Sequence, residues 1–173
     1  MLLKGKITAF EKDSVFVNDK WIGNGHLVIR KDVLDQVTQA KIEARGTMDR
    51  TPNVESVFPK SSALDYCNYG SSTNIYAEVT NKYSTKAIEC CAILFPADKL
   101  SNPAHVTWVN REIFSWFVGL GLKQPVASDG AIVAYDDLDE ICGIFMPIAN
   151  VTDKMKMIGD AIVSDNEKRC FDD

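Results

Sequence analysis

The chain has 173 residues, 46% of them hydrophobic and 25% charged, which is typical of a folded protein and argues against disorder. Its formal net charge is −5, so it has no general attraction to nucleic-acid phosphates or anionic lipids. The longest apolar stretch, residues 113–122, is about half as long as a membrane-spanning helix needs to be.

The five cysteines indicate a reducing compartment. They are odd in number and lack the spacing of a disulfide framework. Residues 1–6 contain no apolar run long enough for a signal peptide, so we expect a cytoplasmic protein. Cys90 and Cys91 are adjacent on a predicted strand and point to opposite faces, which favours small core residues over a chelating pair.

Residues 1–25 predict an N-terminal β-hairpin extension, and a strand that leads into a helix follows it. The elements expected in the extension are strands at 2–10 and 14–18 and turns at 18–20 and 23–25. Residues 26–30 predict the next strand. Asp32 is a good N-cap for a helix that ends near Arg45, with Gly46 in the C′ position.

The faces of this first helix follow from a rotation of about 100° per residue. The expected core face holds Val33, Leu34, Val37, Ala40 and Ala44. The expected outward arc holds Asp35, Thr38, Gln39, Ile42, Glu43 and Arg45. This arc has no excess of positive charge.

The middle of the chain, residues 47–72, is the least regular part. Its prolines and serine pairs allow at most one short strand, at 54–58. Two strands joined by a polar turn follow at 74–79 and 87–95. Two prolines then mark the link at 96–103, which is too short to separate independent domains.

The second half repeats the order of the first. A strand at 106–109 leads into a helix at 111–120 that Asn110 caps. A hairpin follows, with strands at 131–135 and 141–148 around a solvated acidic turn at 136–140. Residues 151–173 predict a short helix, with apolar residues at helical spacing from Met155 to Ile162, and then a charged tail.

A seven-residue pattern occurs at both strand-to-helix junctions. Residues 28–34 (VIRKDVL) and 108–114 (WVNREIF) align as two apolar residues, a polar one, a base, an acid and two apolar ones, at an offset of 80 residues. The repeat predicts a duplicated α+β domain at 26–150, with halves at 26–95 and 96–150.

The two junctions, with the closing segment 143–148 (GIFMPI), resemble a DNA sliding-clamp domain. The resemblance covers residues 26–148. It implies two βαβββ halves, with both helices on one face of antiparallel sheets. It also implies a processivity factor of DNA replication or repair. Authentic clamps string several such domains together and line their helices with bases to bind phosphates. This chain holds one domain, and its predicted helix faces are not basic, so nucleic-acid binding is expected to be weak.

No residue pattern predicts a catalytic, cofactor or metal site. His26 and His105 lack metal-ligand spacing, and residues 23–25 (GNG) are too short for a phosphate-binding fingerprint. Ser61 and Cys67 lie in the irregular segment without a histidine nearby in sequence. We therefore expect a protein that is not an enzyme and uses no cofactor.

We expect a non-enzymatic interaction protein that binds a protein partner or itself, and slightly favour a homodimer. The size suits a phage or mobile-element protein. The expected interface residues are Trp116, Ser115, Gly119, Ile42 and Arg111. Trp116 is the anchor because it lies at the border of core and solvent, and Ser115 and Gly119 would let a second helix approach. The alternatives are a replication or repair module related to processivity factors and a small enzyme with a site in residues 47–72.

Overall fold

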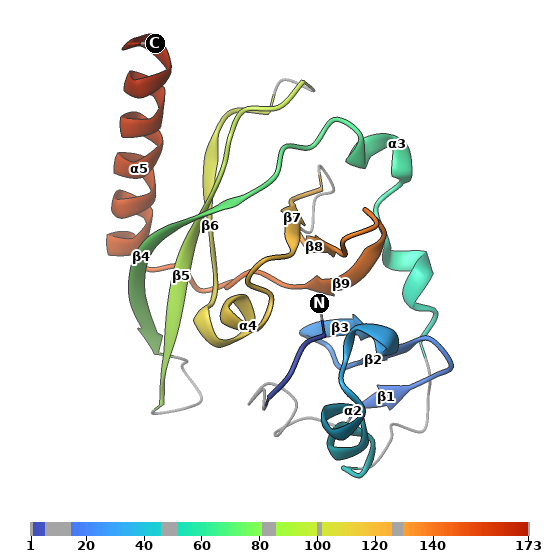
Figure 1. Cartoon of the computed structure of the whole chain (residues 1–173). Helices are drawn as coiled ribbons and strands as arrows, with labels where there is room; N and C mark the ends of the chain where they lie inside the picture. Colours follow the sequence, from blue (N-terminus) through green and yellow to red (C-terminus); the bar gives the residue numbers. More distant parts are fainter. Residues whose placement is uncertain are drawn as a thin grey trace.

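The computed structural model describes residues 2–5, 15–45, 52–80, 86–99, 102–125 and 130–172. In these residues the chain is an α+β protein with two antiparallel sheets (Figure 1). The predicted α+β class is confirmed. None of the described helices is long and apolar enough to cross a membrane.

The larger sheet has six strands, three from residues 16–30 and three from residues 121–145. Its order is β1 (Phe16–Val17), β2 (Trp21–Gly23), β3 (Leu27–Arg30), β9 (Ile141–Phe145), β8 (Ile132–Tyr135) and β7 (Gly121–Lys123). Asn18 makes the turn between β1 and β2, because its side-chain oxygen accepts hydrogen bonds from two backbone N–H groups. The predicted strand 2–10 lies largely outside the described residues. The predicted turn at 18–20 is confirmed.

The smaller sheet has the order β4 (Ser71–Thr80), β5 (Ala87–Phe95) and β6 (His105–Asn110). Its strands extend the predicted ones by a few residues at most. β3, the first strand of the first predicted half, pairs with β9, the last of the second. β6, the first strand of the second half, pairs with β5, the last of the first. Because of this exchange, each sheet contains strands from both predicted halves.

The two strand-to-helix junctions differ in detail. β6 runs directly into α4 (Arg111–Trp116), and Asn110 caps it by accepting from the N–H groups of Glu112 and Ile113, as predicted. After β3 the chain instead makes a 3₁₀ turn at Lys31–Val33, and α2 spans Gln36–Glu43 with Asp35 as its cap. The predicted cap at Asp32 is therefore wrong.

The later start of α2 rotates the helix away from its expected orientation, although Glu43 and Arg45 are exposed as expected. Thr38 and Ile42, expected to face outward, are buried, whereas the side chain of Val37 is 63% exposed. Ala40 and Ala44 are exposed as well. The cause is the break between the 3₁₀ turn and α2, which changes the rotation at which the helix begins. Val33, in the turn, still packs in the main core with Ile113 of α4.

The main core lies between the two sheets, and a second core lies beneath the C-terminal helix. β3, β5 and β9 contribute Ile29, Ile93 and Phe145 to the first. The opposite face of the smaller sheet packs Cys90 and Trp108 against α5 (Asp153–Asp172) (Figure 1). The predicted short helix with a charged tail is wrong, because α5 continues through most of that tail.

Residues 52–70 form two short helical turns rather than the predicted strand at 54–58. A 3₁₀ turn spans Val54–Val57, and α3 spans Ser61–Leu64. Val54 packs in a cluster with Trp21, and Leu64 packs in another with Tyr135. This segment therefore covers the side of the larger sheet that faces away from the main core.

Candidate functional site

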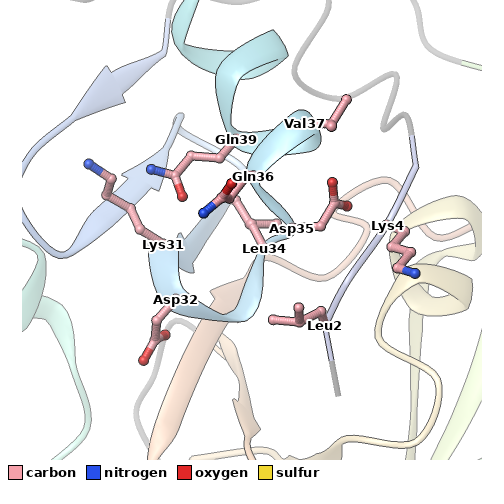
Figure 2. A pocket seen from close by; sticks show the side chains of 9 residues that line it. All are labelled: Leu2, Lys4, Lys31, Asp32, Leu34, Asp35, Gln36, Val37 and Gln39. Atoms are coloured by element: carbon pink, nitrogen blue, oxygen red, sulfur yellow. The ribbon is translucent and has the colours of Figure 1, made fainter.

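A groove along α2 hollows the described surface. We call it the α2 groove. Its first hollow, of about 730 Å³, is lined by Leu2, Lys4, Lys31, Asp32, Leu34, Asp35, Gln36, Val37 and Gln39 (Figure 2). Its second hollow, of about 560 Å³, is lined by Lys4, Gly5, Asp35, Val37, Thr38, Lys41, Ile42, Ala44, Arg45 and Trp116. Because the two share Lys4, Asp35 and Val37, they form one continuous surface.

The N-terminal segment builds one side of the groove. Leu3 donates its N–H to Val33 (2.7 Å) and accepts from the N–H of Asp35 at 3.2 Å. Leu3 is buried by this pairing, and Leu2, the residue before it, is 54% exposed. Figure 2 shows Leu2 and Lys4 on this segment, across the hollow from the residues of α2. Alternation along an extended chain thus places Leu2 and Lys4 at the groove.

Trp116 closes the other end of the groove. Its indole N–H donates to the Lys4 carbonyl at 3.0 Å, which ties α4 to the N-terminal segment. The ring packs edge-to-face on Phe117, with centroids 5.8 Å apart. Trp116 is only partly buried, whereas Trp21 and Trp108 are 2% and 3% exposed. It is therefore the most accessible of the three tryptophans. It lies at the border of core and solvent, as the sequence predicted.

The second hollow has an excess of positive charge. Lys4, Lys41 and Arg45 line it together with one acid, Asp35. Asp35 accepts hydrogen bonds from the hydroxyl of Thr38 (2.6 Å) and from its N–H (3.0 Å). The side-chain bond from Thr38, followed by the backbone bond, holds the pKa of Asp35 below its ordinary value. The hollow thus combines an indole ring and apolar side chains with three bases, in a chain whose net charge is −5.

The structure brings together only part of the predicted interface. Trp116 and Ile42 both line the second hollow, although Ile42 is 7% exposed and packs mainly inward. Arg111 belongs elsewhere, because its guanidinium lies 3.8 Å from the ring centroid of Tyr76 and pairs with Glu89.

The sequence predicted that Ser115 and Gly119 share one face of the second helix, and this prediction is wrong. α4 ends at Trp116, so Ser115 is an exposed helix residue, whereas Gly119 lies in the turn beyond the helix with a φ of 91°. That backbone conformation favours glycine. Sequence reasoning also missed Leu2, Lys4 and Lys41 as groove residues. The alternation of Leu2, Leu3 and Lys4 was the available signal for an extended segment. It does not indicate which element that segment faces.

Cys67, considered for catalysis, and His105, considered as a metal ligand, both contact other residues of the fold. The Cys67 thiol is buried and donates to the Ala63 carbonyl at 3.2 Å. His105 stacks on Phe95 and hydrogen bonds to Gln124 at 2.8 Å. Among the described residues, no group of three or more His, Cys, Asp or Glu side chains is arranged to hold a metal ion.

The acidic turn between β8 and β9 was predicted to be solvated, and this is only partly correct. Asp136 points inward and pairs with Arg30, and its side chain is 14% exposed. Asp137, Asp139 and Glu140 are exposed. One acid of the cluster is therefore largely buried, whereas the other three are exposed.

No protein-family model matches the chain, and no curated protein or solved structure matches it either.

Proposed function

We propose that the chain is a non-enzymatic interaction protein built on a single clamp-like domain, which binds a protein through the α2 groove. Two features support the clamp-like part. The first is the repeated strand-to-helix pattern at an offset of 80 residues. The second is the reciprocal pairing of β3 with β9 and of β6 with β5, which joins the two predicted halves.

The observation that carries the binding function is the composition of the groove. Leu2 and Val37 are 54% and 63% exposed, and both line the first hollow. Trp116 stands in the adjoining hollow among lysines. Partly exposed tryptophan next to aliphatic and basic side chains is typical of protein interfaces.

A matched pair of substitutions tests the proposal. Val37→Ser changes an exposed apolar residue in the groove, and Leu138→Ser changes another, 80% exposed, at the tip of the β8–β9 turn. We expect Val37→Ser and Trp116→Ala to weaken binding at least tenfold and Leu138→Ser to leave it unchanged. Self-association is measured by light scattering. Other partners are identified by crosslinking, and each is then titrated into the wild type and the variants. A chain that binds no protein, or binds equally well with both groove changes, would contradict the proposal.

A replication or repair module that contacts nucleic acid is the second candidate. The observation in its favour is the three bases of the second hollow. An acidic chain with one small basic patch predicts weak, salt-sensitive contact at most. A small enzyme with a site in residues 47–72 is the third candidate. The described part of that segment packs Leu64 and Val54 into apolar clusters.

A further inference from the structure

The far end of α5 carries an apolar side chain that its own molecule does not cover. The first turns of α5 are held on the smaller sheet through Met155 and Gly159, which are buried. From Ser164 onward nearly every residue is exposed. Phe171 is 89% exposed, which is more than any other large hydrophobic residue described. A phenylalanine in water loses the free energy that its burial would provide.

The charges near Phe171 complement those of the α2 groove. Residues 165–173 carry four acids and two bases, Lys168 and Arg169, and Phe171 is followed by Asp172 and Asp173. The second hollow of the groove presents Lys4, Lys41 and Arg45 around an accessible indole ring. An aromatic side chain followed by acids therefore matches a tryptophan surrounded by bases, both in apolar character and in charge.

The two surfaces cannot meet within one molecule. In Figure 1 the end of α5 and helix α2 lie at opposite ends of the fold. α5 is continuous over Asp153–Asp172, so its end could turn back only if the helix broke. A contact between the end of α5 and the groove therefore requires two copies of the chain.

We propose that the end of α5 of one copy docks in the α2 groove of another, with Phe171 against Trp116 and Asp172 beside Lys41. This inference rests on the proposed function of the groove and names its occupant. The contact joins two different surfaces. Two such contacts can be made reciprocally in a dimer, and otherwise they continue around a closed ring or along an open filament.

The first experiment measures self-association by light scattering on the full chain at roughly 100 μM, where a contact of micromolar Kd is saturated. Phe171→Ser is expected to weaken association at least tenfold. The matched control is Met157→Ser, which removes another exposed side chain of α5 (72%). It is expected to change nothing. A monomeric wild type, or association indifferent to Phe171→Ser, would overturn the proposal.

A charge exchange tests the pairing itself. Lys41→Glu alone and Asp172→Lys alone are expected to weaken association, and the two together are expected to restore most of it. Absence of rescue in the double variant overturns the pairing of Asp172 with Lys41. Circular dichroism of each variant separates loss of contact from loss of fold.

A third measurement uses the accessible tryptophan. A synthetic peptide of residues 160–173 is titrated into the full-length Phe171→Ser variant, and acrylamide quenching of its fluorescence is followed. The peptide is expected to protect Trp116, because the other two tryptophans are already buried. If quenching is unchanged, the inference fails. If quenching is unchanged while Val37→Ser still abolishes binding of another protein, the proposed function of the groove stands without it.

Discussion

Arg30 and Asp136 are 106 residues apart in the sequence, and their side chains form an ion pair with a nitrogen-to-oxygen distance of 2.5 Å. Both side chains are largely buried, with 10% and 14% exposed. The Arg30 guanidinium also donates to Asp32 and to the carbonyl of Ile141. The pair therefore joins the end of β3 to the turn between β8 and β9, at the point where the two predicted halves exchange strands.

Removal of the buried acid is expected to destabilise the fold. Asp136→Asn leaves Arg30 with a neutral partner in a largely desolvated place, and we expect a loss of about 2–3 kcal/mol in the free energy of unfolding. Glu140→Gln is the control, because Glu140 lies 3.6 Å from the same guanidinium but is 71% exposed. Its loss should be below about 1 kcal/mol. Urea denaturation of the three proteins measures both values, and equal losses would contradict this account.

The same pair predicts how stability depends on acid. Burial alone would raise the pKa of Asp136, but hydrogen bonds from Arg30 and from the N–H groups of Glu140 and Leu138 outweigh it and hold the pKa below 3.8. A carboxyl with a lowered pKa in the folded state contributes its full stabilisation above the unfolded value. That contribution is lost as the pH falls through the folded value.

Thermal unfolding from pH 7 to pH 2 tests the acid dependence. The wild type should lose more stability below about pH 4 than Asp136→Asn, whose acid limb should be flatter. Parallel curves for the two proteins would show that Asp136 is not the titrating group.

The sequence predicted the second strand-to-helix junction better than the first, for a physical reason. At Asn110 one residue combines a good cap with a strand that ends directly before it. At the first junction Asp32 and Asp35 are equally good caps by type. One local and one long-range contact distinguish them. Asp32 is engaged by Arg30, two residues before it, and Leu34 bridges to Leu3. The bridge between Leu34 and Leu3 cannot be inferred from local pattern, and the α2 groove depends on it.

The orientation of α2 gives a direct test of this correction. Ile42 is 7% exposed and packs in the main core, so Ile42→Ala is expected to cost about 2–3 kcal/mol. Val37→Ala, at 63% exposure, should change stability by less than about 0.5 kcal/mol. The sequence pattern predicts the opposite order. Urea denaturation of both variants decides between the two orientations.

The thiols should react very unequally. Burial raises the pKa of Cys142 to about 12 and that of Cys90 to about 11, and it also raises the pKa of Cys91. Cys67 is buried, whereas Cys170 is exposed on α5. Because the thiolate is the reactive form, we expect one thiol per folded chain to react rapidly with a disulfide reagent at pH 8 and all five to react after denaturation. Cys170→Ser should abolish the rapid phase, and a second rapid thiol would show that the core opens.

Binding of duplex DNA should be weak. Several bases outside the groove are paired with acids, as Arg30 is with Asp136 and Arg111 is with Glu89. Three bases at one hollow neutralise few phosphates, so we expect a Kd at or above roughly 10⁻⁴ M at physiological salt. Fluorescence anisotropy with a labelled duplex across a salt series measures it. Micromolar affinity with a steep salt slope, lost in Lys41→Glu, would make the groove a nucleic-acid site and would favour the replication module over the protein-binding domain.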